Sequence, residues 1–245
     1  MLSAAQQLIV IDNESGNRLA GVSLRKTNEG PEKDLVEWFL ANLPFTAGKG
    51  NQLTIFREPR LLSGIPDLVL VEWDMAVAAH WNSRRKDVKF QDLKLAHHLA
   101  TAGPCTRSML SKLGIPRIDG SLERLKQSGI VRVTRKDYWQ LKCAINRLFA
   151  VRRIIAVEAK IADTKRALKQ AFLNTWFSCA SYVLLPSDPK WTILKTAAQL
   201  NIGVVSRSAG GVCAPVSSRQ RKGPKSLGAW LFNEWAWKAS FVGAG

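Results

Sequence analysis

The sequence predicts an α/β fold assembled from two segments of the chain, with a basic helical module between them. Two apolar runs of strand length, LVLVEW at 68–73 and IIAVEAKI at 154–161, are continuous enough to be strands buried on both faces. After the second run, helical and strand patterns alternate, which is typical of an α/β sheet. The stretch from 84 to 142 is basic and helical instead, so we expect it to be a separate module.

The composition is that of a folded protein with a strong positive charge. Of the 245 residues, 46% are hydrophobic, which excludes a disordered chain. Lysine and arginine outnumber aspartate and glutamate by 36 to 19, a net charge of +17, which attracts polyanions such as nucleic acids. Because the sequence shows no signal peptide, no long apolar run and no basic amphipathic helix, we expect an intracellular, cytoplasmic protein with no membrane partner.

The elements of the two segments follow from local patterns. In the N-terminal stretch, 1–29, residues 8–11 suggest a short strand. A helix is predicted from Pro31 to near Pro44, because proline and acidic residues open it and apolar residues follow at helical spacing. The remaining predictions are strands at 53–56, 68–73, 154–161, 181–186 and 203–208 and helices at 164–178 and 190–200.

The last part of the chain, 211–245, predicts a basic loop followed by a closing helix. Residues 217–225 carry four cations beside glycine and proline, which is typical of an exposed loop. The helix at 227–237 is rich in tryptophan, and we expect Trp230, Trp235 and Trp237 in the core or in an interface rather than stacked on bases.

Charged residues at strand ends carry the candidate chemistry. Side chains alternate faces along a strand, so Glu158 and Lys160 point the same way at the end of their apolar run. Burying such charges is costly unless they pair with each other or with a metal. Asp67 opens the neighbouring run, and carboxylates from adjacent strands can hold Mg²⁺. Such a site suits phosphodiester hydrolysis, where a metal neutralises an oxygen and lowers the pKa of the attacking water.

This order of residues resembles the PD-(D/E)XK nuclease superfamily, the restriction-endonuclease-like enzymes. The resemblance rests on Glu37 in the first helix, Pro66-Asp67 at a strand start and Glu158-Ala159-Lys160 on the next strand, followed by a helix with Gln170. It implies a core with a mixed central sheet flanked by helices, made from 30–78 and 148–210. It also implies a Mg²⁺-dependent endonuclease acting on DNA, in which Mn²⁺ can substitute.

The resemblance further implies a role for each matching residue. Asp67 and Glu158 are expected as metal ligands, with the backbone carbonyl of Ala159 as a third. Lys160 is expected to orient the water or to stabilise the transition state. Glu37 is expected to complete the outer metal shell, and Gln170 to support the site from its helix.

The spacing departs from the usual pattern, because about 90 residues separate Asp67 from Glu158. We therefore expect an insert at 84–145. It contains predicted helices at 92–100, 106–113 and 121–127 and strands at 130–134 and 138–142, which is similar to a winged helix. That similarity implies DNA recognition, with the third helix in the major groove and a basic hairpin on the phosphate backbone. The implied contacts are Arg117, Arg124 and Lys126 for the helix, and Arg135 and Lys136 for the hairpin.

Plainer alternatives stay open. Glu158 and Lys160 could form a structural ion pair, Asp67 could be a turn residue, and Glu32 or Asp34 could replace Glu37. At the level of function, the alternatives are a non-catalytic DNA-binding protein that uses the nuclease fold as a scaffold, and a nuclease subunit of a transposase or defence complex that is active only with a partner. Cutting both strands with one site per chain favours a homodimer or a larger nucleoprotein complex.

Overall fold

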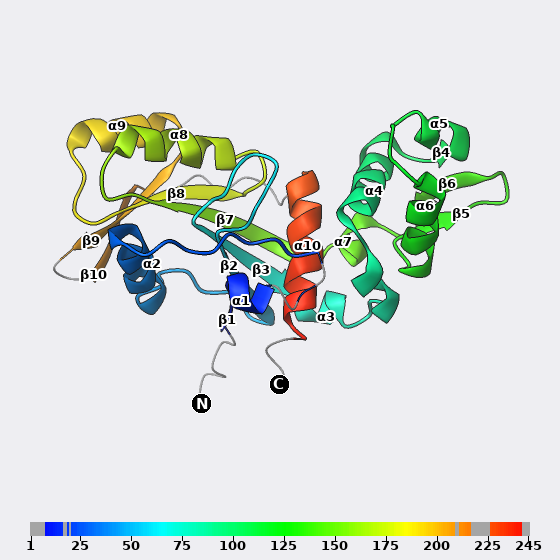
Figure 1. The fold of residues 1–245 in the computed structure, drawn as a ribbon, viewed down its shortest axis with the longest axis horizontal. Coiled ribbons are helices and arrows are strands. Elements are labelled where there is room, and N and C mark those ends of the chain that lie inside the picture. Colours follow the sequence, from blue (N-terminus) through cyan, green and yellow to red (C-terminus); the bar gives the residue numbers. More distant parts are fainter. Residues whose placement is uncertain (1–7, 17–18, 20, 209–210, 217–225, 242–245) are drawn as a thin grey trace.

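A computed structural model describes residues 8–16, 19, 21–208, 211–216 and 226–241. Its centre is a mixed seven-stranded sheet in the order β1-β2-β3-β7-β8-β9-β10, with helices on both faces, so the predicted α/β class is confirmed (Figure 1). The strands are β1 (Leu8–Ile11), β2 (Asn51–Arg57), β3 (Leu68–Asp74), β7 (Val151–Ala159), β8 (Ala180–Leu185), β9 (Gly203–Ser208) and β10 (Gly211–Val216).

The two apolar runs of the sequence are the adjacent central strands β3 and β7. They pair antiparallel, and β7, β8 and β9 then run parallel to one another. Six of the seven residues of β3 and all six of β8 are buried. Helices cover both faces of these strands, which is why their sequences are apolar throughout instead of alternating.

Helices α2 (Pro31–Ala41), α8 (Thr164–Asn174) and α9 (Trp191–Gln199) cover the sheet. The buried side chains of α2, Phe39 among them, pack on the face formed by Ile55, Leu70 and Val157. Those of α8 and α9 pack on the other face, on β8 and β9. Figure 1 shows α2 on the opposite side of the sheet from α8 and α9.

The insert leaves the sheet after β3 and returns just before β7, its direct neighbour. It contains three main helices and a three-stranded antiparallel sheet in the order β4-β6-β5, at one end of the molecule (Figure 1). The predicted three helices and basic hairpin are therefore present. Their bounds are α4 (Phe90–Ala102), β4 (Cys105–Thr106), α5 (Arg107–Ser111), α6 (Ile118–Gln127), β5 (Val131–Val133) and β6 (Tyr138–Leu141). Four short helices complete the described chain: α1 (Asn13–Gly16), α3 (Met75–Ala78), the 3₁₀ helix η1 (Ser83–Asp87) and α7 (Ile145–Leu148).

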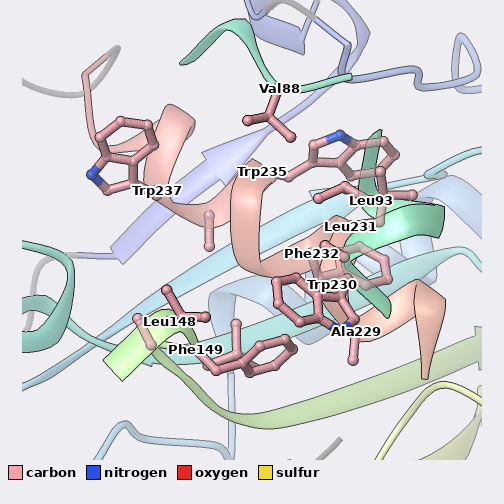
Figure 2. Close-up of a cluster of buried hydrophobic side chains, with 14 of the residues drawn as sticks. Val88, Leu93, Leu148, Phe149, Ala229, Trp230, Leu231, Phe232, Trp235 and Trp237 are labelled. Carbon is pink, nitrogen blue, oxygen red and sulfur yellow. The ribbon is translucent and has the colours of Figure 1, made fainter. Parts of the chain in front are cut away.

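The tryptophan-rich helix α10 (Leu227–Ala239) packs between the sheet and the insert. Figure 2 shows its side chains in one cluster with Leu93 of the insert and with Phe149, which precedes β7. The ring of Trp230 meets that of Phe149 edge to face at 5.2 Å. Trp230, Trp235 and Trp237 are all buried, as expected for core residues.

Several element bounds differ from the sequence prediction. Strand β7 ends at Ala159 rather than at 161, so Lys160 follows the strand instead of lying in it. Helix α8 ends at Asn174 rather than at 178. The strand β10 was not predicted, because glycine and Pro215 are poor strand formers; β10 lies at the sheet edge, where proline is tolerated. The predicted loop at 217–225 lies outside the described residues. None of the helices in the described part of the chain has both the length and the apolar character needed to cross a membrane.

Candidate active site

The register of β3 and β7 brings Asp67 and Glu158 together. Leu68 pairs with Val157, so in the same register Asp67, one residue earlier, lies opposite Glu158, one residue later. Residues directly opposite each other on antiparallel strands project to the same face of the sheet. The backbone N–H of Ala159 donates a hydrogen bond of 2.7 Å to Oδ2 of Asp67. A carboxylate that is about 90 residues distant in sequence is thereby fixed at the end of β7.

The two carboxyl groups disfavour each other's charge. Burial first, and then the charge of Asp67, raise the pKa of Glu158 to about 8, although a 2.6 Å hydrogen bond from Nδ2 of Asn174 opposes the rise. Burial also raises the pKa of Asp67 to about 6, and the Ala159 N–H opposes this rise. At neutral pH the proton therefore stays mainly on Glu158, while Asp67 is mostly ionised.

Lys160 lies beside the pair but makes its ion pair elsewhere. Its Nζ is 2.7 Å from Oε1 of Glu32 in the first turn of α2. The predicted same-face partner, Glu158, is bonded by Asn174 instead. The charge of Lys160 still lowers the pKa of both Asp67 and Glu158, so the ammonium acts on the acidic pair from a distance.

A pocket of about 440 Å³ opens at this edge of the sheet. Asp67 and Lys160 line it, together with the first turns of α2 and α8. The N-termini of both helices therefore border the pocket and add positive potential to it. Its other charged lining residues are the cations Arg25, Lys33, Arg57 and Arg166 and the acids Glu29, Glu32, Glu58 and Asp163.

Two residues of the predicted site lie apart from this arrangement. Glu37 forms an ion pair with Arg57 and is not among the residues that line the pocket. Gln170 makes no described contact with the acidic pair, and its Oε1 is buried without a hydrogen-bond partner among the described residues. Glu32 and Asn174, on the same two helices, take the positions expected of Glu37 and Gln170.

Sequence reasoning missed Arg25, Glu58 and Asn174. Glu58 has a left-handed backbone, forms an ion pair with Arg25 and donates its N–H to the carbonyl of Asp67 at 2.9 Å. No periodicity points to either residue of that pair. Asn174 had a visible signal, since it lies on the buried face of α8 with Ala167 and Ala171.

Of the five cations predicted to contact DNA, one is held in an ion pair with a buried carboxylate and four are exposed. Arg124 donates two hydrogen bonds, of 2.8 and 2.7 Å, to the buried carboxylate of Asp92, so it ties α6 to α4 and is withdrawn from the set of DNA contacts. Lys126 is exposed and lies 3.7 Å from Glu123. Arg117 at the start of α6, and Arg135 and Lys136 in the turn between β5 and β6, are exposed and face solvent.

The side chains near Asp67 and Glu158 decide whether a metal ion could bind there. The described residues contain no group of three or more His, Cys, Asp or Glu side chains that could hold an ion. Asp67 and Glu158 nevertheless supply two carboxylates. Burial raises the pKa of both, and repulsion by Asp67 also raises the pKa of Glu158. A divalent cation bound between them would stabilise their ionised forms and so compensate both effects. Because Mg²⁺ is commonly held by one or two carboxylates and retained waters, the pair fits such an ion.

Comparisons of this chain with protein-family models, with curated proteins and with solved structures found no match.

Proposed function

We propose that this protein is a Mg²⁺-dependent endonuclease that hydrolyses DNA phosphodiester bonds. The observation that carries the proposal is the pair Asp67 and Glu158, two carboxyl groups set side by side with both pKa values raised, of which Asp67 lines the pocket and Glu158 is buried behind it. Structural charges are normally paired with opposite ones, whereas two neighbouring acids with raised pKa values beside a pocket are typical of metal and catalytic sites. The fold is compatible with a restriction-endonuclease-like core, and the proposal includes that assignment.

In this proposal Asp67 and Glu158 hold the ion, and the carbonyl of Ala159 is a third candidate ligand. A bound Mg²⁺ or Mn²⁺ supplies charge neutralisation at the phosphate and a water of lowered pKa. Asn174 and the Ala159 N–H hold the two carboxylates in place. Lys160 contributes positive charge beside the phosphate.

The insert is proposed to bind the DNA. Its order of helices and strands is winged-helix-like, and the whole chain has a net charge of +17. Arg135 and Lys136, exposed in the hairpin turn, are the proposed phosphate contacts, and Arg117 at the start of α6 and Lys126 on α6 remain candidates for the groove. With one site per chain, a homodimer or a larger nucleoprotein complex would cut both strands.

One observation favours the scaffold alternative. The ammonium of Lys160 is already neutralised by Glu32, as a purely structural lysine would be. A non-catalytic DNA-binding protein needs no intact carboxylate pair, so carboxylate variants separate the two functions. A nuclease subunit that needs a partner would bind DNA and the metal, and would cut only in the complete complex.

Plasmid cleavage by the purified protein tests the proposal. Wild type is expected to nick or linearise plasmid at low salt with Mg²⁺ or Mn²⁺ and to be inactive in EDTA. Glu158→Gln, Asp67→Asn and Lys160→Ala should lose this activity, whereas Glu123→Gln on the exposed face of α6 should retain it. Metal-dependent cleavage that survives in both carboxylate variants would place the activity elsewhere.

A further inference from the structure

Helix α8 exposes a stripe of basic and aromatic side chains. Lys165, Lys169, Phe172 and Trp176 recur at intervals of four, three and four residues, so they follow one face of the helix and of the turn after it. All four are exposed, Phe172 by 47% and Trp176 by 42%. The opposite face, which includes Ala167 and Ala171, is buried against the sheet.

Core packing does not account for the aromatic half of this stripe. Leu173, next to Phe172, is also exposed by 48%, so an apolar surface faces solvent over the last turn of α8. Trp176 is held in place by Phe177, whose ring it meets at 5.6 Å with the planes 74° apart. A held aromatic ring gives up little conformational entropy on binding, which makes it a suitable platform for another flat group.

The charge of α8 indicates the chemistry of its ligand. The helix TKRALKQAFLN contains three cations and no acidic residue. Among the described residues, Lys165, Arg166 and Lys169 form no ion pair. A surface that joins unpaired cations to exposed aromatic rings is complementary to a nucleic-acid strand, whose phosphates are anionic and whose bases can stack.

The stripe starts at the candidate active site. Arg166 in the first turn of α8 lines the pocket that contains Asp67, and Lys165 precedes it. From Lys165 to Trp176 the helical rise is roughly 16 Å, directed along the sheet towards α10 (Figure 1). A strand lying on this face would therefore lead into the pocket.

We infer that α8 binds a single-stranded segment of DNA that runs into the active-site pocket, with Lys165 and Lys169 on phosphates and Phe172 and Trp176 stacked on bases. This inference rests on the proposed nuclease function and narrows its substrate class. The preferred substrate carries an unpaired stretch next to the bond that is cut, because bases inside a duplex cannot stack on the rings.

Binding measured in EDTA tests the inference separately from cleavage. Fluorescence anisotropy with a labelled oligothymidine and with a labelled duplex is compared for wild type, Phe172→Ser and Trp176→Ser. Each variant should bind the oligothymidine roughly tenfold more weakly, since stacking supplies much of the affinity, and should bind the duplex as wild type does. Phe241→Ser is the matched control, because Phe241 is exposed by 51% and lies outside α8.

Three results would overturn the inference: unchanged oligothymidine binding in Trp176→Ser, an equal weakening for oligothymidine and duplex, or a dimer in sedimentation that only the α8 variants disrupt. The last result would assign the stripe to a second copy of the chain. If wild type binds oligothymidine through α8 yet neither binds Mn²⁺ nor cuts plasmid, the nuclease proposal fails while the strand-binding surface remains.

Discussion

Arg85–Glu234 and Asp67–Glu158 both join ionisable side chains in the interior, but the first is a buried pair of opposite charges and the second joins a half-buried and a buried carboxyl group. Arg85 and Glu234 carry opposite charges, each is exposed by only 2%, and two hydrogen bonds of 2.7 Å join them. The guanidinium also donates to the carbonyl of Leu148 and lies 3.5 Å from the centre of the Trp81 ring. This pair joins both connections of the insert to α10, and its charges are fully compensated.

Asp67 and Glu158 would carry the same charge if both were ionised, and the hydrogen bonds from Ala159 and Asn174 offset burial only in part. A compensated pair contributes to a fixed structure, whereas an uncompensated pair costs stability unless something else neutralises it. Burial of an ionisable group alone therefore does not identify a functional site, whereas a neighbour of the same charge sign points to one.

The largest expected effect comes from breaking the compensated pair. Glu234→Ala leaves the guanidinium of Arg85 buried without its partner, which should lower the free energy of unfolding by about 3–5 kcal/mol. Urea denaturation measures this decrease. The exposed pair Arg107–Asp119 is the control, and Asp119→Asn should leave the urea midpoint unchanged. If the Glu234→Ala protein were as stable as wild type, the pair Arg85–Glu234 would not be the stabilising ion pair described above.

Removing a carboxylate from the pair Asp67–Glu158 should increase the stability of the metal-free protein, the opposite of the effect at Glu234. Between pH 4.5 and about 8 the folded protein keeps a proton on Glu158 that the unfolded chain releases, so the stability of the metal-free wild type falls as the pH rises through this window. Glu158→Gln removes that penalty and should stabilise the metal-free protein by roughly 4 kcal/mol at pH 8 and by less than about 1 kcal/mol at pH 5. Urea midpoints across this range provide the measurement. A decrease in stability at pH 8 would show that the carboxylate is well compensated.

An intermediate case is the ion pair of Arg124 with Asp92 inside the insert. Asp92 is fully buried and Arg124 is partly exposed, so Arg124→Ala should cost about 1–3 kcal/mol by leaving a buried carboxylate short of partners. Thermal unfolding checks this expectation. If the variant keeps wild-type stability but binds DNA more weakly, Arg124 returns to the set of DNA contacts.

The smallest effect on stability is expected at the hairpin of the insert. Arg135→Gln and Lys136→Gln remove exposed cations, so the melting temperature should not move. The slope of log affinity for duplex DNA against log salt should become shallower by roughly 0.9 for each phosphate that the variant no longer neutralises. Anisotropy at several salt concentrations measures this slope. An unchanged slope in the double variant would exclude the hairpin from the DNA interface.

Most of the fold could be predicted from the sequence, because the signals are local. The runs at β3 and β7 are apolar throughout, and α2, α4 and α6 each show their own helical periodicity. The edge strand β10 lacked such a signal, since proline and glycine interrupt it.

The site was less predictable, because it depends on register and on helix phase. Asp67 and Glu158 could be proposed as strand-end acids from the sequence. Which acidic residue of α2 meets Lys160, however, depends on the orientation of that helix. That orientation brings Glu32 rather than Glu37 to Lys160. Arg85 and Glu234 are 149 residues apart, and no periodicity connects them.

Calorimetric titration of metal-free protein with Mn²⁺ at pH 7, in buffers of different ionisation enthalpy, would show whether Asp67 and Glu158 bind a divalent metal. Binding to the Asp67–Glu158 pair should release protons, because the raised pKa values leave these carboxyl groups partly protonated before the metal arrives. Asp67→Asn and Glu158→Gln should abolish this binding, and Glu37→Gln should preserve it. The assignment of this pair as the metal site would be contradicted if wild type did not bind Mn²⁺, or if both carboxylate variants bound Mn²⁺ as tightly as wild type does.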